Sequence, residues 1–137
     1  EKDINDIYGL YYERIAGSAR SGLFDVVGHC DLVKKFGHRP TTAMEEILRE
    51  TFKVVKESGM SVEINTSGLR KPVKEVYPSE TVRKSGSEYG MPLTLGSDAH
   101  TPGDVGRDFD VARALVQKYG GGKISVYTKR QRSEMVL

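Results

Sequence analysis

The chain has 137 residues, and its 21 lysines and arginines nearly balance its 19 aspartates and glutamates, which leaves a formal net charge of +2. This length fits one ordinary domain, and the balanced charge does not predict binding to nucleic acid. No apolar run approaches the roughly 20 residues of a membrane helix, and the polar start predicts neither a signal peptide nor a lipid anchor. The lone cysteine, Cys30, excludes an internal disulfide framework and predicts a cytoplasmic protein.

The residue pattern in the first half of the chain predicts two helices and two strands. Apolar residues at helical spacing predict a helix over residues 4–19, with Asp3 as its cap, and the apolar run 23–27 predicts a buried strand. The pattern Thr-x-x-Glu at residues 42–45 predicts a capping box at the start of a second helix. A second strand is expected at residues 60–64.

The second half continues the same alternation of helices and strands. Residues 65–78 are expected to form a loop, because their prolines and glycine oppose regular structure. A helix over 79–89 and a strand over 92–95 follow. The last predicted elements are a helix over 109–119 and a strand over 123–127. Regular alternation of this kind predicts an α/β fold with four parallel strands joined by right-handed helical crossovers.

Three of the four predicted strands run directly into polar residues. The carboxyl ends of parallel strands all point the same way, so these segments should meet at one rim, where the active sites of barrels and open α/β sheets lie. The segments are "GHCD" at 28–31, "NTSGLRK" at 65–71 and "GSDAH" at 96–100.

The histidine and carboxylate side chains of this rim predict a metal site. Asp98 and His100 are alternate residues at a strand end, so they can face the same side and supply one oxygen and one nitrogen ligand. His29 is expected on the same rim. This mixture of ligands suits zinc, manganese or iron and does not choose among them.

Other polar residues of the rim have two possible roles each. Glu63 is buried by pattern, so it is either a ligand or a hydrogen-bond acceptor beneath the site, whereas Asp31 and Ser97 are expected in a second layer that orients the ligands. Arg70 and Lys71 are either solvated loop charges or a phosphate-recognition pair. No acidic residue within 65–73 neutralises Arg70, so its five donors are expected to be free for an anion.

Three long segments of the chain resemble a known family. "DVVGHCDLVKKFG", "VEINTSGLRKPVKEVYPS" and "PLTLGSDAHTPGDVGRDFDVA" are similar to the polymerase-and-histidinol-phosphatase (PHP) superfamily, above all to its histidinol-phosphatase branch. The resemblance implies a distorted (β/α)7 TIM-like barrel that holds up to three divalent metals. It also implies hydrolysis of a phosphomonoester, L-histidinol phosphate, in histidine biosynthesis.

The resemblance also implies roles for individual residues. His29, Asp98 and His100 correspond to metal ligands of the family, and Asp98 could also orient the attacking hydroxide. Arg70 would hold the substrate phosphate and stabilise its developing charge. The further residues expected at the substrate mouth are Tyr11 or Tyr12, Lys71 and the basic loop of Lys34, Lys35 and Arg39.

The chain departs from the family pattern in its missing first motif. Family members begin with a strand that bears an HxH motif, and no HxH occurs here. A complete (β/α) barrel needs about 200 residues or more, so residues 1–137 are predicted to be one partial domain, the C-terminal half of a barrel.

Two alternatives to the phosphatase stay open. One is a PHP-type phosphodiesterase acting on nucleotides or nucleic acids, which the near-neutral charge disfavours. The other is a half-barrel without activity that associates through its open strand edges. The 137-residue chain alone is expected to be a weak or inactive phosphatase, because a two-metal site needs ligands that it lacks.

Overall fold

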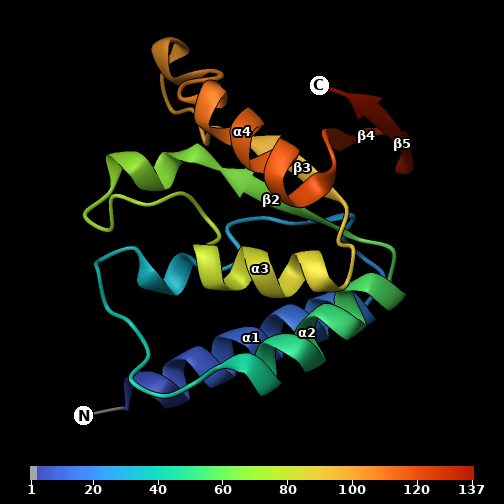
Figure 1. Cartoon of the computed structure of the whole chain (residues 1–137). Helices are drawn as coiled ribbons and strands as arrows, with labels where there is room; N and C mark the ends of the chain where they lie inside the picture. The colour runs from blue at the N-terminus through green and yellow to red at the C-terminus, as the bar shows by residue number, and fades with distance from the viewer. Residues whose placement is uncertain (1–2) are drawn as a thin grey trace.

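The computed structural model describes residues 3–137 and shows an α/β fold (Figure 1). Helices and strands alternate through most of the chain, and three short 3-10 helices lie in the loops. In chain order the elements are α1 (Ile4–Arg20), β1 (Val26–Val27), η1 (Leu32–Lys34), α2 (Glu45–Glu57), β2 (Ser61–Asn65), η2 (Thr66–Arg70), α3 (Glu80–Glu88), β3 (Leu93–Gly96), η3 (Pro102–Asp104), α4 (Phe109–Gly120), β4 (Lys123–Thr128) and β5 (Gln131–Val136).

The centre of the fold is a parallel sheet with the strand order β1-β2-β3. Val26 pairs with Ser61, and Val62 pairs with Leu93, so β2 is the middle strand. Helices α1, α2 and α3 lie on one side of the sheet and α4 lies on the other (Figure 1). A parallel sheet needs cover on both faces, and its three carboxyl ends open at one rim.

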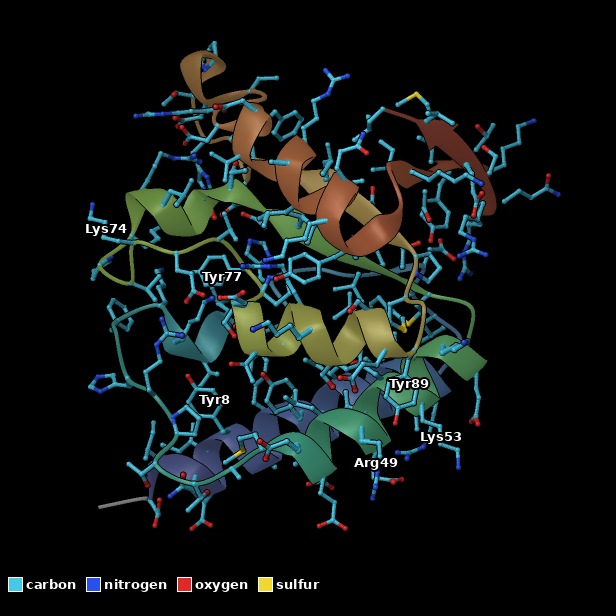
Figure 2. All side chains as sticks on the ribbon, viewed as in Figure 1. Tyr8, Arg49, Lys53, Lys74, Tyr77 and Tyr89 are labelled. Carbon is cyan, nitrogen blue, oxygen red and sulfur yellow. The ribbon has the colours of Figure 1, made fainter. Side chains whose placement is uncertain are left out.

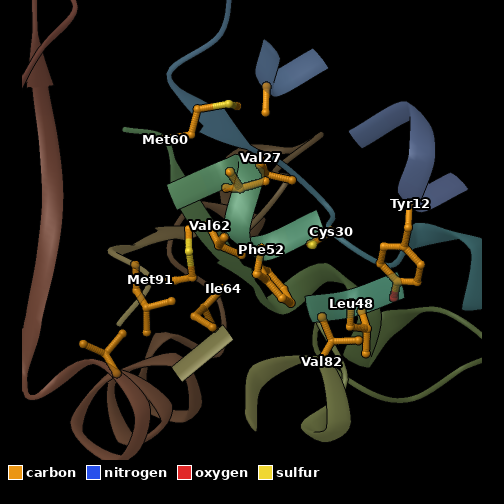
Figure 3. Packing of buried hydrophobic residues seen from close by; sticks show 14 of the residues in the cluster. Tyr12, Val27, Cys30, Leu48, Phe52, Met60, Val62, Ile64, Val82 and Met91 are labelled. Atoms are coloured by element: carbon orange, nitrogen blue, oxygen red, sulfur yellow. The ribbon is translucent and has the colours of Figure 1, made fainter. Parts of the chain in front are cut away.

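The core lies between this sheet and its helices. Leu48, Phe52 and Val55 lie along one face of α2, at the spacing of successive helical turns, and pack with Val62 and Ile64 of β2 (Figure 3). On the outer side of α2, the charged side chains Arg49 and Lys53 project away from the core, whereas Tyr77 points into the interior (Figure 2). None of the helices within residues 3–137 combines the length and the apolarity needed to cross a membrane.

The fourth predicted strand does not join the parallel sheet. β4 pairs antiparallel with β5, a strand that the sequence analysis did not expect, and Ser125 lies opposite Glu134. The hairpin turn consists of Lys129 and Arg130, which have φ angles of 50° and 66°. A two-residue turn with both φ angles positive matches the right-handed twist of paired strands. The prediction of four parallel strands was therefore wrong for the last one.

Side chains of the hairpin anchor it to the residue before β1. Arg130 donates from Nε to Asp25 Oδ2 and from Nη2 to Asp25 Oδ1, both at 3.1 Å. The Tyr127 hydroxyl donates to the Asp25 carbonyl at 2.8 Å. The hairpin is thus fixed beside the sheet by side chains rather than by a ladder of backbone hydrogen bonds.

The predicted start of α2 was also wrong. Thr42 makes no capping box with Glu45, because its backbone N–H and hydroxyl both donate to Asn5 Oδ1, at 3.2 Å and 3.1 Å. Met44 is the N-cap and makes no side-chain capping bond. The cap of α1 is as predicted, since Asp3 accepts from the backbone of Asn5 at 2.8 Å.

Two further boundaries differ from the predictions. The strand expected over 23–27 is only Val26–Val27, since Leu23 and Phe24 are exposed rather than buried. The loop expected over 65–78 contains η2, and Asn65 forms an isolated antiparallel bridge with Tyr77. This folded loop covers the carboxyl end of β2.

Candidate active site

The rim at the carboxyl ends of the parallel strands brings His29 and Asp98 together. Nε2 of His29, which follows β1, lies 3.4 Å from Oδ2 of Asp98, which follows β3. Both residues have φ angles near +50° (49° and 48°), in the left-handed region that non-glycine residues seldom adopt. Such backbone strain is concentrated at functional sites. The predicted convergence of these two strand ends is confirmed.

Glu63 reaches the same point from β2. Its Oε2 atom accepts hydrogen bonds from the backbone N–H of His29 at 3.1 Å and from Asn65 Nδ2 at 2.9 Å, and it lies 3.9 Å from His29 Nδ1. Of the two roles considered for Glu63, these contacts are those of an acceptor beneath the site. We call His29, Glu63 and Asp98 the rim cluster.

A glycine makes room for the Glu63 carboxylate. A Cβ atom added at Gly96, the last residue of β3, would overlap Glu63 Oε1. The neighbouring strand therefore has no side chain where the carboxylate lies. This close approach explains the glycine before the Ser-Asp-Ala-His stretch.

The charge of Asp98 is stabilised by the two histidines. Desolvation opposes its ionisation, but the hydrogen bond and charge of His29, with the charge of His100, hold the pKa of this carboxyl below its ordinary value. His100 lies at the same strand end, where its Nδ1 is 2.8 Å from the Asp98 carbonyl oxygen and 3.9 Å from Oδ1. Its side chain is 76% exposed, so it faces solvent more than the cluster.

The donors of the rim cluster are of the types that bind metal ions. His29 and Asp98 supply one imidazole nitrogen and one carboxylate within contact distance of each other, which is the ligand chemistry expected for zinc, manganese or iron. Within residues 3–137, however, no group of three or more histidines, cysteines, aspartates or glutamates is arranged to hold a metal ion. The role of His100 as a third ligand stays a prediction.

Arg70 lies at the rim, but its guanidinium is not free, contrary to the expectation from the sequence. Its Nη2 donates to the carbonyl of Ser97 at 2.6 Å. Its Nε lies 3.7 Å from Asp104 Oδ1, and its Nη1 lies 3.7 Å from Asp108 Oδ2. The side chain is 18% exposed. The prediction failed because it searched for acidic partners only in the local sequence, and the partners come from the loop after β3.

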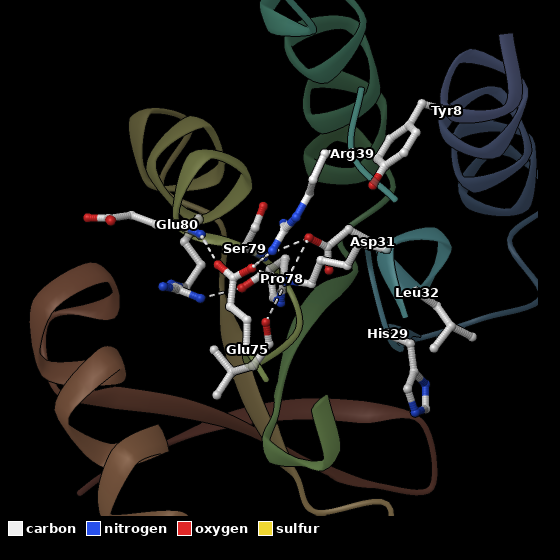
Figure 4. A network of polar contacts seen from close by, with 12 residues as sticks. Tyr8, His29, Asp31, Leu32, Arg39, Glu75, Pro78, Ser79 and Glu80 are labelled. Carbon is white, nitrogen blue, oxygen red and sulfur yellow. Dashed lines mark hydrogen bonds and ion pairs between the residues drawn. The ribbon is translucent and has the colours of Figure 1, made fainter. Parts of the chain in front are cut away.

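Lys34 lies in a separate group of charged side chains and is itself almost completely buried. Its ammonium is 3.1 Å from Asp31 Oδ2, 3.1 Å from Glu75 Oε2 and 2.7 Å from the Val76 carbonyl. Figure 4 shows the two acidic residues of this group. Burial lowers the pKa of Lys34, and the two carboxylates oppose that shift. The pKa of Asp31 is raised by burial, against the charge of Lys34.

Asp31 and Arg39 belong to the same group. Asp31 accepts from the backbone N–H of Ser79 at 2.7 Å, and Arg39 pairs with Glu75 at 2.6 Å. The expected roles of Asp31 in orienting metal ligands and of Arg39 in contacting substrate stay predictions; in the structure both residues are paired with groups near the start of α3. We call Asp31, Lys34, Arg39 and Glu75 the ion network.

Three further predicted residues support the rim through their contacts. The Tyr11 hydroxyl donates to the His29 carbonyl at 2.7 Å and accepts from the backbone of Leu32 at 3.2 Å, and burial raises the pKa of this tyrosine. Ser97 accepts from Gly106 N at 3.2 Å through its hydroxyl. The backbone N–H of Lys71 closes η2, and its side chain is partly buried.

The sequence analysis missed Asn65 as a residue of the site. Asn65 is fully buried, and its Nδ2 lies 3.3 Å from His29 Nε2 as well as 2.9 Å from Glu63. It stands two residues after Glu63 on β2, so strand geometry places both side chains on one face. That spacing was the signal that could have identified it.

Comparison with known proteins supports the resemblance to histidinol-phosphatases, although no family model matches the chain. The chain is 42% identical over 125 residues to the "Probable histidinol-phosphatase" of Deinococcus radiodurans, covering 91% of this chain and 47% of that protein. It is 34% identical over 116 residues to the histidinol-phosphatase of Bacillus subtilis, covering 78% and 43%.

The chain is similar to histidinol-phosphatases. A crystal structure of a Listeria monocytogenes protein assigned as a histidinol phosphatase has a TM-score of 0.63 and 30% identity, over 74% of this chain and 42% of that one. The chain thus spans less than half the length of the curated relatives that it matches.

Proposed function

We propose that this chain forms part of a metal-dependent phosphatase of the histidinol-phosphatase type. The reaction is the hydrolysis of L-histidinol phosphate to L-histidinol and phosphate, a step of histidine biosynthesis. The observation that carries the proposal is the contact between His29 and Asp98 at 3.4 Å, at the rim of a parallel sheet, in a chain 42% identical to such a protein over 91% of its length.

The proposed metal ligands are His29, Asp98 and His100. Their donor types fit zinc, manganese or iron, with up to three ions in the complete enzyme, and the further donors that such a centre needs are proposed to come from outside residues 3–137. A divalent ion, when bound, neutralises charge on the phosphoryl oxygens and makes water a better nucleophile at neutral pH. Glu63 fixes the turn that presents His29, through its bond to the His29 N–H.

Arg70 is proposed to contact the phosphate of the substrate. A guanidinium presents donors in a planar fork that matches phosphate oxygens, and Arg70 is bonded to the residue directly before Asp98. The parallel sheet of this chain is proposed to form part of a distorted (β/α)7 barrel in which residues 1–137 are one partial, C-terminal domain. A cytoplasmic location and association through open strand edges also remain proposals.

The proposal is tested by metal content and turnover in the natural gene product. The changes His29→Ala and Asp98→Asn should each lower kcat/KM for L-histidinol phosphate by at least about a hundredfold, with loss of bound metal by elemental analysis. His38→Ala is the matched control, because this third histidine is exposed in a loop. Full activity in His29→Ala, or equal losses in His38→Ala, would contradict the proposal.

A further inference from the structure

Four charged side chains alternate in sign beside the rim cluster. Oδ1 of Asp104 lies 3.7 Å from Nε of Arg70 and 3.1 Å from Nη1 of Arg107. Oδ2 of Asp108 lies 3.7 Å from Nη1 of Arg70 and 4.0 Å from Nε of Arg107. The two aspartates and Arg107 all come from the loop between β3 and α4, so this loop supplies the ion-pair partners of Arg70.

The carboxylate of Asp104 is itself held in place. Its Oδ2 accepts from the Thr101 hydroxyl at 3.1 Å, and its backbone N–H donates to the Thr101 carbonyl at 3.0 Å. The loop is tied to η2, because the Thr66 hydroxyl donates to the Arg107 carbonyl at 2.7 Å. The hydrogen bond of Arg107 and that of Thr101, followed by the charge of Arg70, hold the pKa of Asp104 below its ordinary value.

Within residues 3–137, the guanidinium of Arg70 makes one hydrogen bond, from Nη2 to the Ser97 carbonyl. Its Nη1 is buried and has no hydrogen-bond partner among the residues that the structure describes. An arginine fork recognises an anion well only when its long side chain is already held in one orientation. The two aspartates supply that restraint, and Asp104 is the less exposed of the two.

We propose that Asp104 is a positioning residue that holds the Arg70 guanidinium beside Asp98 and thereby sets the affinity of the rim for a phosphate group. The inference rests on the proposed function, in which Arg70 contacts the substrate phosphate. It adds a residue from the loop after β3 that acts through Arg70 and makes no contact with substrate.

The sign of the effect separates positioning from simple electrostatics. A carboxylate close to a phosphate site repels the anion, so electrostatics alone predicts that Asp104→Asn binds phosphate more tightly. Positioning predicts the opposite, because the amide no longer holds the guanidinium by charge. The two accounts therefore differ in direction and not only in size.

The experiment measures the Kd of inorganic phosphate by calorimetry in the natural gene product, together with kcat and KM for L-histidinol phosphate. Asp104→Asn should raise the phosphate Kd about fivefold to tenfold and lower kcat/KM by a similar factor. Asp104→Glu, which keeps the charge but moves it, should also raise the Kd. Asp110→Asn is the matched control, since Asp110 is an exposed carboxylate at the start of α4; its Kd should stay within about twofold of the parent value.

A double-mutant cycle identifies the residue through which Asp104 acts. In an Arg70→Ala background the effect of Asp104→Asn on the Kd should vanish, and in an Arg107→Gln background it should persist. Tighter or unchanged binding in Asp104→Asn, or an effect that survives Arg70→Ala, would overturn the inference. If the parent protein binds phosphate but does not hydrolyse histidinol phosphate, the proposed function fails while the cycle still decides the role of Asp104.

Discussion

The rim cluster and the ion network begin only two residues apart in the chain, yet they have different surroundings. His29 is part of the rim cluster, and about a third of its side chain is exposed. Asp31 is part of the ion network, where it and Lys34 are almost wholly buried. Cys30 lies between them and packs into the core. The same short segment thus contributes to a solvent-accessible site and to a structural anchor.

The difference lies in how completely the charges are paired. The Lys34 ammonium has three partners, two carboxylates and one carbonyl, so no donor is left for a ligand. The rim cluster has one histidine between two carboxylates and opens to solvent, so its groups can still bind an ion or a substrate. Polar residue type alone does not show which of these situations a residue will have.

The largest effect on stability is expected from Lys34→Met. Removing the ammonium leaves the buried Asp31 carboxylate without its charge partner, which should lower the free energy of unfolding by about 3–5 kcal/mol. Urea unfolding measures the change. Lys53→Met, on the exposed side of α2 (Figure 2), is the control and should change stability by less than about 0.5 kcal/mol. A large fall in kcat/KM with unchanged stability would instead indicate that Lys34 contacts the substrate.

Gly96→Ala should give the next largest effect, and it acts on the rim cluster. The new methyl group overlaps Glu63 Oε1, so the carboxylate must leave its present position, at a cost of about 1–3 kcal/mol. Gly17→Ala is the matched control, because a methyl group there meets open space in α1 and should stabilise the helix by about 0.5–1 kcal/mol. Equal melting temperatures for the two variants would contradict this account.

A smaller effect is expected from Glu75 in acid. Desolvation opposes the charge of Glu75, but the hydrogen bond of Arg39 and the charge of Lys34 outweigh it, so the pKa of this carboxyl lies below its ordinary 4.5. The unfolded chain therefore takes up this proton first, and the free energy of unfolding should fall as the pH drops below 4.5.

Glu75→Gln should make that fall less steep, as measured by urea unfolding at a series of pH values. Between about pH 6 and 8 the parent and the variant should differ by a constant amount, because the carboxylate is then ionised in both states. Parallel curves through the acid range would show that Glu75 does not carry this dependence.

The smallest effect is expected from Arg39→Ala. Arg39 pairs with Glu75 at 2.6 Å, but nearly half of its side chain is exposed, and exposed pairs contribute about 0–1 kcal/mol. The melting temperature should therefore change little, and kcat/KM should not change. A loss of kcat/KM without a loss of stability would indicate that Arg39 contacts the substrate, and it would weaken the distinction between the rim cluster and the ion network.

Elements with strong periodic patterns could be predicted from the sequence. The apolar spacing of α2 and α4 and the apolar run of β2 are local signals that the packed structure keeps. The β4–β5 hairpin could not be predicted, because its turn is Lys129–Arg130 rather than an asparagine–glycine pair. The β5 strand is exposed along its whole length, so it shows no alternation of apolar and polar residues.

The part of the candidate site that lies at the ends of the parallel strands could be predicted from the order of the strands. Parallel strands bring their carboxyl ends together, which is enough to place His29 near Asp98. The ion partners of Arg70 and Lys34 depend on how distant loops fold back, and no local pattern marks Asp104 or Glu75 as those partners. A lysine is almost never fully buried, so no sequence pattern predicts that Lys34 lies in the interior.

The contact between Asp25 and Arg130 has a consequence for the order in which the protein takes shape during its synthesis. These residues are 105 positions apart, and a ribosome that adds about 5–20 residues per second needs roughly 5–20 seconds to make the chain between them. Helix α1 and the strands of the parallel sheet are made before Arg130 exists. The amino end of β1 is therefore among the first parts of the sheet to be synthesised, whereas its side-chain contact with the hairpin can form only after the whole parallel sheet has been made.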